Sequence, residues 1–323
     1  MKMDCIYLSR FIKCKTRIKE KIMEKKVAVL ISTYNGEKYI KEQIDSILNQ
    51  TYKNIEIVIR DDGSSDSTIE IVKEYQQKHN NIILKEGTNI GFIKSFFKLL
   101  ELADSDYYAY CDQDDIWMEK KIELAVNALN EADNTKPNMV FGNSDYYDEN
   151  MKLISEGEKH RTFSFKNSLY ECVAQGMTMT INQAAKELIR DNIPEKCLFH
   201  DWWTYMICSG MGQVWYNDET VVKYRRFQKN ATAEGQNALK VFLWRIEKLF
   251  TDNGMKDIKI QQLEYKKMFY NKLPDENKKI LDIFVQEKYN FFKAIRKVFY
   301  PQKLRRKLID DIMVRILFLF GIL

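Results

Sequence analysis

The sequence predicts an α/β fold in which a mostly parallel central sheet is flanked by helices and followed by a helical C-terminal appendage. From Lys26 to about residue 130, short apolar runs alternate with segments whose apolar residues recur at helical spacing. Strands that alternate with helices imply βαβ crossovers and hence parallel pairing. From Gln236 onward only helical spacing remains, first in Leu239, Phe242, Leu243 and Ile246 and then in Leu263, Tyr265 and Met268.

The expected elements follow one another closely in the first half of the chain. Val27–Ile31 is a continuous apolar run, short enough for a buried strand. Further strands are expected at 55–59, 82–84 and 107–111. Amphipathic helices are expected between them, around 40–48, 69–75 and 96–102. A helix to about Asn130 and a strand at 139–142 come next, and shorter elements continue to about Tyr224.

Composition narrows the class of protein. Of the 323 residues, 45% are hydrophobic and 30% charged, as in an ordinary folded protein with one large domain or two. The six cysteines are scattered and only three histidines are present, so no zinc-site spacing exists and reduced cytosolic thiols are favoured. No apolar run reaches the roughly 18 residues of a spanning helix. We expect three regions: a basic N-terminal extension (1–24), a globular domain (25–235) and a helical region (236–323).

Positive charge gathers at both ends of the chain. Residues 1–26 hold nine Lys and Arg against three acids, and residues 288–307 hold eight against none, followed by the apolar tail 316–323. A basic stretch beside an apolar one is attracted to an anionic membrane surface. We therefore expect the C-terminal region to associate with a membrane surface. Nucleic acid is not expected as a partner, because no recognition module accompanies the basic residues.

Three polar motifs follow the first, second and fourth expected strands. They are Ser32-Thr33-Tyr34-Asn35-Gly36-Glu37, Asp61-Asp62-Gly63-Ser64-Ser65-Asp66 and Asp112-Gln113-Asp114-Asp115-Ile116-Trp117. The loops after parallel strands open on one edge of the sheet, so these motifs should share one crevice. Clustered carboxylates repel unless a cation absorbs their charge, and hard oxygen ligands suit Mg²⁺ or Mn²⁺. Each motif alone can also be a solvated turn. No Gly-x-Gly-x-x-Gly follows the first strand, and a P-loop is absent from the sequence.

The three motifs in this order closely resemble the inverting, nucleotide-sugar-dependent family 2 glycosyltransferases of the GT-A fold. The likeness covers about Lys25 to Gly235, and residues 89–94 and 112–117 lean toward rhamnosyltransferase-like members. It implies transfer of a sugar, with L-rhamnose favoured, from a dTDP- or UDP-linked donor to a glycan or lipid-linked acceptor in cell-surface polysaccharide synthesis. It also implies Mg²⁺ or Mn²⁺ as cofactor and a cytoplasmic protein at the inner face of the cell membrane.

The resemblance implies a nucleotide-binding set. Asp61 or Asp62 could accept the N–H of a uracil or thymine base, Tyr34 could cover that base, and Lys94 could neutralise phosphate, although a solvated lysine is the common case. Gly63 and Ser64 allow a sharp turn beside the nucleoside. The full set is Ser32, Thr33, Tyr34, Asn35, Glu37, Asp61, Asp62, Lys94 and Asp112.

Metal and acceptor residues are implied in the same way. Asp114 is the expected metal contact, with Asp112 near the ribose or the metal and Asp115 in support; Trp117 is expected to anchor the following helix. Inversion needs a base for the acceptor hydroxyl. The resemblance points to Asp201, whose pKa Trp202 and Trp203 would raise by desolvation; capping a helix is its other expected role. Gln175, Gly176, His200 and Trp202 would lie on the acceptor side.

One departure from the family pattern stands out. Related sequences often carry Tyr-Arg-x-His, whereas this chain has Tyr224-Arg225-Arg226-Phe227. Phenylalanine cannot ligate a cation, so Arg225 or Arg226 is expected to meet the diphosphate instead. The difference keeps a catalytically degenerate nucleotide- or glycan-binding module as an alternative. A sugar nucleotidyltransferase is another, although the Ser32–Gly36 segment lacks its phosphate-binding arginine. An interaction-only membrane adaptor would leave the acids unexplained.

Overall fold

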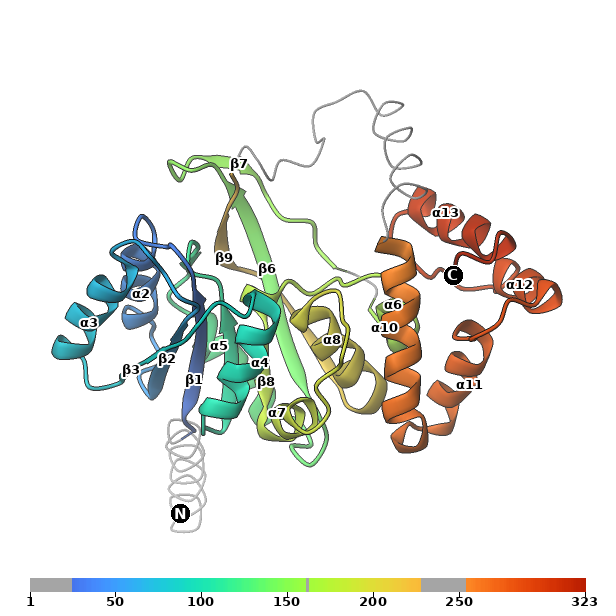
Figure 1. Cartoon of the computed structure of the whole chain (residues 1–323), viewed down its shortest axis with the longest axis horizontal. Helices are drawn as coiled ribbons and strands as arrows, with labels where there is room; N and C mark the ends of the chain where they lie inside the picture. Colours follow the sequence, from blue (N-terminus) through green and yellow to red (C-terminus); the bar gives the residue numbers. More distant parts are fainter. Residues whose placement is uncertain (1–24, 161–162, 228–253) are drawn as a thin grey trace, which may run out of the picture.

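A computed structural model describes residues 25–160, 163–227 and 254–323. Within them, nine strands form one twisted sheet in the order β3-β2-β1-β4-β8-β6-β9-β5, with β7 beside β6 (Figure 1). Helices cover both faces of the sheet, and a group of C-terminal helices packs at one side. The predicted α/β class is confirmed.

The first four strands run parallel, as predicted. They are β1 (Val27–Thr33), β2 (Ile55–Asp61), β3 (Ile82–Glu86) and β4 (Tyr107–Cys111). Their crossover helices are α2 (Ile40–Leu48), α3 (Thr68–Lys78) and α4 (Phe92–Leu102). Side chains of a strand alternate between faces, so Val27 and Val29 pack in the apolar cluster of α2 and α5 (Lys121–Asn130), whereas Ala28 and Leu30 pack in that of α4.

The second half of the sheet contains antiparallel as well as parallel strand pairs. β8 (Thr180–Asn182) is antiparallel to both β4 and β6 (Met139–Tyr147), and β9 (Val214–Arg225) runs parallel to β6. Two short strands, β5 (Ile116–Trp117) and β7 (Leu153–Ser155), pair antiparallel with β9 and β6. The helical segments here are α6 (Phe165–Ser168), η1 (Gly176–Thr178), α7 (Gln183–Arg190) and α8 (His200–Met211).

The C-terminal helices belong to the same core as the sheet. They are α10 (Gly254–Phe269), η3 (Tyr270–Lys272), α11 (Asp275–Phe284), α12 (Phe291–Val298) and α13 (Leu308–Leu319), on the right of Figure 1. Tyr265, Phe284 and Phe318 pack in one buried cluster with Trp203 of α8 and with Tyr170, which follows α6. The helical C-terminal region is thus present and docked on the α8 side.

Some predicted features fall outside the described residues. These are the basic extension at 1–24, the boundary at residue 235 and the helical spacing of Leu239, Phe242, Leu243 and Ile246. Among the residues that the structure does describe, none of the helices has the length and apolarity to cross a bilayer.

Candidate active site

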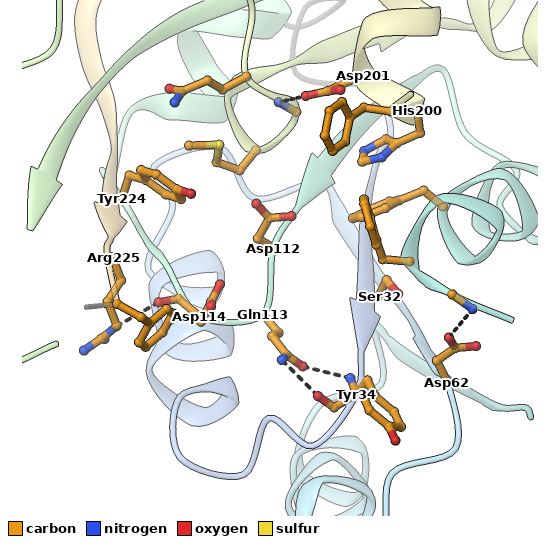
Figure 2. Close-up of a pocket in the computed structure, with 18 of the residues that line it drawn as sticks. Ser32, Tyr34, Asp62, Asp112, Gln113, Asp114, His200, Asp201, Tyr224 and Arg225 are labelled. Atoms are coloured by element: carbon orange, nitrogen blue, oxygen red, sulfur yellow. Dashed lines mark hydrogen bonds between the residues drawn. The ribbon is translucent and has the colours of Figure 1, made fainter. Parts of the chain in front are cut away.

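The polar turns after β1, β2 and β4 meet at one cavity of about 700 Å³ (Figure 2). The cavity lies beyond the carboxyl ends of the parallel strands, where open α/β sheets bind ligands. It also reaches η1, the start of α8 and the end of β9. Ten of the predicted site residues line it: Ser32, Tyr34, Asp62, Asp112, Asp114, Gln175, Gly176, His200, Asp201 and Arg225.

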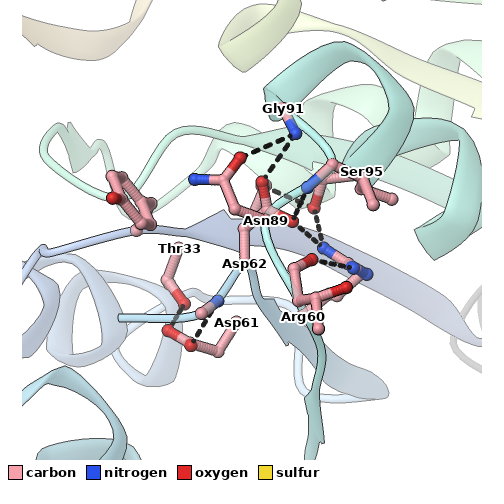
Figure 3. Close-up of polar contacts among 12 residues, drawn as sticks. Thr33, Arg60, Asp61, Asp62, Asn89, Gly91 and Ser95 are labelled. Carbon is pink, nitrogen blue, oxygen red and sulfur yellow. Dashed lines mark hydrogen bonds and ion pairs between the residues drawn. The ribbon is translucent and has the colours of Figure 1, made fainter. Parts of the chain in front are cut away.

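The two aspartates after β2 differ in position (Figure 3). Asp61 is buried and accepts hydrogen bonds from the Thr33 hydroxyl (3.0 Å) and from the backbone N–H groups of Gly63 (3.0 Å) and Ser64 (2.8 Å), so it shapes the turn from inside. Asp62 lines the cavity. The structure therefore brings Asp62, rather than Asp61 or Thr33, to the ligand-facing wall.

Asp62 is held by a buried arginine and a neighbouring loop. Arg60 pairs with its carboxylate and also donates to the Ser95 hydroxyl (3.1 Å). The N–H groups of Ile90 and Gly91 donate to Asp62, each at 2.9 Å. Gly91 has φ +81°, a conformation that favours glycine. This network ties the start of α4 to the end of β2.

The turn after β1 is braced by the turns beside it. The backbone N–H of Tyr34 donates to Oε1 of Gln113 (2.9 Å), and Nε2 of Gln113 donates to the Tyr34 carbonyl (3.2 Å), as Figure 2 shows. The ring of Tyr34 is half exposed beside the cavity. Asn35 and Glu37 lie outside the lining and accept hydrogen bonds from the backbone N–H groups of Ser65 and Ser67. These two residues therefore fix the loops and do not reach the cavity.

The carboxylates of Asp112 and Asp114 face the middle of the cavity. Burial, followed by the charges of Asp114 and Asp201, raises the pKa of Asp112 to about 7. Burial also raises the pKa of Asp114, against the charge of Arg225. Asp115 lies behind them, fully buried: one oxygen accepts the backbone N–H of Arg225 (3.0 Å), and its pKa is well above normal, because of burial and of the other two acids.

The chemistry of this pair fits a divalent cation. Across the described residues, no side-chain or backbone donor of another residue is hydrogen-bonded to the carboxylate of Asp112 or Asp114, and a cation between them would relieve their mutual repulsion. No set of three His, Cys, Asp or Glu side chains converges in the part of the chain described. Mg²⁺ is commonly held by one or two carboxylates with phosphate oxygens of the substrate. Asp112 and Asp114 could hold an ion in this way, together with a bound diphosphate.

Asp201 lies across the cavity from these acids (Figure 2). It sits in the first turn of α8 and accepts the backbone N–H groups of Gly176 (3.0 Å) and Trp202 (2.7 Å). Burial raises its pKa to about 6 against these hydrogen bonds. The expected capping role is wrong, because α8 begins at His200 with Phe199 at its N-cap and Asp201 lies inside the first turn. A carboxylate with this pKa is ionised at neutral pH and can still accept a proton.

The residues around Asp201 divide into two groups. His200 lines the cavity, stacks on Phe96 with 3.9 Å between ring centroids, and has its pKa lowered to about 3 by burial. Neither of its ring nitrogens has a hydrogen-bond partner among the described residues. Trp202 points away, because its Nε1 donates to the Ser168 carbonyl (2.6 Å) in the core. Trp203 is fully buried.

The end of β9 places its arginines differently from the expected diphosphate contacts. Arg225 lines the cavity, but its guanidinium donates to the carbonyls of Asp114 (2.8 Å) and Glu149 (2.7 Å) and pairs with Glu42. Arg226 lies over the ring of Tyr146, 4.6 Å from its centroid, and is not part of the lining. Phe227 lines the cavity and packs on Tyr39 at 5.3 Å.

Several lining residues were not assigned roles from the sequence. They are Asn89, Gly91, Phe92, Phe96, Gln113, Met177, Phe199 and Tyr224. Gln113 lies within the third motif and Phe199 directly precedes His200. Their closeness to these motifs in the sequence is the signal that could have predicted their place in the cavity. Conversely, Lys94 lines a neighbouring cavity. Which of the two cavities Lys94 faces depends on how α4 is rotated about its axis, and the spacing of residues in the sequence does not determine that rotation.

Comparison with known proteins agrees with this architecture. Residues 28–197 match the family described as Glycosyl transferase family 2. A dTDP-rhamnosyl transferase, RfbG of Shigella flexneri, is 31% identical over 222 residues, covering 62% of this chain and 72% of that protein.

Solved structures share the fold at low identity. S. aureus TarS 1–349 in complex with UDP-GlcNAc superposes with a TM-score of 0.52 at 16% identity, covering 90% of each chain. The Pyrobaculum calidifontis mannosyltransferase PcManGT, solved with GDP-Man and Mn²⁺, gives 0.51 at 16% identity, covering 92% of this chain and 74% of that one.

Proposed function

Because the chain belongs to glycosyl transferase family 2, as a rhamnosyltransferase-like member, we propose that it is an inverting, metal-dependent transferase of L-rhamnose from a dTDP-linked donor. The acceptor is a glycan or lipid-linked glycan of a cell-surface polysaccharide. The rhamnose donor is supported by the likeness to the Shigella enzyme. The strongest support for a catalytic role of this site is that Asp112, Asp114 and Asp201 surround one cavity, each with a raised pKa.

The donor nucleotide binds between the turns after β1 and β2. Tyr34 covers the base, and Asp62 accepts the N–H of the pyrimidine with the oxygen lone pairs that its backbone partners leave open. The ion pair with Arg60 fixes the direction of this carboxylate. Ser32 lines the same wall and donates its hydroxyl to Ser95 at 2.7 Å.

The diphosphate lies toward Asp112 and Asp114. Mg²⁺ or Mn²⁺, when bound there, supplies Lewis-acid stabilisation of the negative charge that grows on the leaving diphosphate. Asp114 would be its main ligand and Asp112 the second. Arg225 positions Asp114 and Asp115 through its hydrogen bonds instead of contacting the diphosphate itself. Asp115 is a supporting residue, since it is fully buried.

Asp201 is the base. It removes the proton of the acceptor hydroxyl as the oxygen attacks the anomeric carbon from the face opposite the diphosphate, so the configuration inverts. The two N–H groups that bind its carboxylate orient it toward the cavity. Gly176 permits this close backbone approach: a Cβ there would lie 3.2 Å from Nε2 of His200 and from Cβ of Asp201.

The site is proposed to work at the cytoplasmic face of a membrane. Ten of the twenty exposed large hydrophobic side chains among the described residues lie between Tyr289 and Phe320. On α13, five of them recur on one face at helical spacing: Leu308, Ile309, Ile312, Ile316 and Leu319. Exposed cations accompany them, at Lys288, Lys293, Arg296 and Lys303. Such a face fits an anionic lipid surface.

A donor screen tests this function. The full chain is incubated with dTDP-, UDP- and GDP-linked sugars, with and without Mn²⁺, and release of the nucleoside diphosphate is measured. The expected result is Mn²⁺-dependent turnover of dTDP-rhamnose, and NMR of the product shows the anomeric configuration opposite to that of the donor. A catalytically inactive binding module is favoured instead, in view of Phe227, if dTDP stabilises the protein but no donor turns over.

A further inference from the structure

A second cavity, of about 650 Å³, adjoins the first and shares Gly91 and Phe92 with it. Its other walls come from α4, from the segment 193–198 and from the start of α10, where Ile193, Leu198 and Ile260 contribute apolar side chains. Its volume is typical of small-ligand sites, which run from about 300 to 1,000 Å³. We call this cavity the α4–α10 groove.

Two aromatic rings mark where the groove meets the cavity of the active site. Phe92 is 51% and Phe199 47% exposed, and their ring centroids are 6.2 Å apart. Phe199 directly precedes His200 and Asp201 in the chain, and Phe92 also lies edge-on to the His200 ring at 6.4 Å. The groove therefore opens beside the segment that carries the proposed base.

The start of α4 is held rigidly at this junction. Asp62 accepts the N–H groups of Ile90 and Gly91, which directly precede Phe92. Leu198 is fixed on the other wall, because its N–H donates to Oε1 of Gln261 in α10 (2.8 Å). The ring of Phe92 is thus presented by a fixed backbone, which lowers the cost of ordering it when a ligand binds.

The lining chemistry favours a neutral polyhydroxylated ligand. Pyranose rings expose apolar C–H faces that cover an aromatic ring, while their hydroxyls hydrogen-bond at the edges. Phe92, which lines both cavities, and Phe199, which lines the active-site cavity beside it, supply the aromatic faces, and Lys94, Lys196, Glu195 and Asp257 are exposed around the groove. None of these four charged residues has an ion-pair partner in the described part of the chain. Two cations are balanced by two anions, which disfavours a lipid phosphate.

We propose that the α4–α10 groove binds the sugar units of an oligosaccharide acceptor that precede the unit carrying the reacting hydroxyl. This inference rests on the proposed function and names its acceptor class. Phe92 and Phe199 stack on the penultimate sugar, and the groove holds the units beyond it. Binding energy from such non-reacting units positions the hydroxyl at Asp201, so it raises the rate of transfer as well as affinity.

Acceptor length tests the proposal. Transfer from dTDP-rhamnose is measured to methyl glycosides of one, two and three rhamnose units, and donor hydrolysis without acceptor is measured in parallel. We expect kcat/KM to rise at least tenfold from one unit to three. Ile193→Ser combined with Ile260→Ser should lose most of that gain and leave donor hydrolysis unchanged, whereas Ile154→Ser, an exposed control on β7, should keep the gain.

Substitution of Phe92 tests whether the gain with acceptor length needs an aromatic face. Phe92→Tyr keeps an aromatic face and should keep the gain with length, whereas Phe92→Leu keeps only apolar surface and should lose it. Equal gains in Phe92→Leu and wild type overturn the proposed stacking of Phe92 on the penultimate sugar. A wild-type enzyme that hydrolyses the donor but gains nothing from longer glycosides also overturns it. Absence of both donor hydrolysis and nucleotide binding overturns the proposed function itself.

Discussion

Oδ2 of Asp201 accepts a hydrogen bond of 3.0 Å from the backbone N–H of Gly176, and this contact turns the carboxylate into the cavity. The partners of the proposed base are here two backbone N–H groups, of Gly176 and Trp202, which no side-chain substitution removes. Asp201→Asn removes the proton acceptor and keeps only one of the two backbone hydrogen bonds, because an amide has a single accepting oxygen. We expect kcat for transfer to fall about 10²- to 10⁴-fold, the usual contribution of a general base. Unchanged turnover would contradict the role.

The same carboxylate predicts the pH dependence of transfer. Because burial raises the pKa of Asp201 to about 6, the base is protonated and inactive below that pH. The value of kcat/KM for the acceptor should rise with pH through about 6 and level off above it. Asp112 faces the same cavity, so rates are measured at saturating Mn²⁺, which favours its ionised form. A profile that is flat between pH 5 and 7 would contradict Asp201 as the titrating group.

Arg60 and Asp62 form a buried pair whose loss should cost stability. Their side chains are 8% and 3% exposed, and Arg60 also donates to the Thr88 carbonyl. Removal of one partner of a buried pair costs about 3–5 kcal/mol, because the other charge is left uncompensated. Arg60→Met should lower the free energy of unfolding in urea by about that amount. The exposed pair Lys98–Glu101 provides the control: Lys98→Met should cost less than about 1 kcal/mol.

The parallel half of the sheet could be predicted because its signals are local. Each strand is a short apolar run, and each run ends in a polar turn, so both the topology and the shared crevice follow from the order of motifs. β8 gave no such signal. It has only three residues, Thr180–Asn182, and it is defined by antiparallel pairing with β4 and β6, which are distant in the chain.

The direction of long side chains could not be predicted either, because it too depends on contacts with residues that are distant in the chain. Arg225 was expected to meet a diphosphate, but its guanidinium is engaged by Glu42, which is 183 residues away, and by two backbone carbonyls. Asn35 and Glu37 were grouped with the nucleotide, yet they satisfy backbone N–H groups of the next turn. Such choices depend on which tertiary partner is nearest, and spacing along the chain carries no information about that.

Asp114 is the residue on which binding of Mn²⁺ should depend. Thermal unfolding is followed with dTDP, with Mn²⁺ and with both. A ligand that binds only the folded state stabilises it by about 2.7 kcal/mol at 100 times its dissociation constant. We expect Mn²⁺ to increase the stabilisation by dTDP in the wild type and in Asp218→Ala, a control in an exposed pair, but not in Asp114→Ala. An undiminished Mn²⁺ effect in Asp114→Ala would remove that carboxylate from the metal site.

The exposed face of α13 should govern binding to lipid. Deletion of residues 300–323 is a poor test, because Leu304, Val314 and Leu317 are buried in the core and their loss would unfold the C-terminal region. Ile312→Ser combined with Ile316→Ser changes only side chains that are about half exposed. The double variant should co-sediment much less with vesicles that contain anionic phospholipid, while the control Ile154→Ser should bind like the wild type.

Salt concentration distinguishes the electrostatic contribution to lipid binding from the apolar contribution. The cations Lys288, Lys293, Arg296 and Lys303 are exposed, so their contribution is screened as ionic strength rises and the Debye length falls from about 10 Å at 0.1 M to about 3 Å at 1 M. Wild-type binding should therefore weaken with salt and with neutral vesicles but not vanish, because the apolar face of α13 still inserts. Loss of all binding at high salt would show that charge alone acts. Equal binding of the double variant and the wild type at every salt concentration would show that α13 takes no part, and donor hydrolysis in solution, measured on the same samples, verifies that each variant is folded.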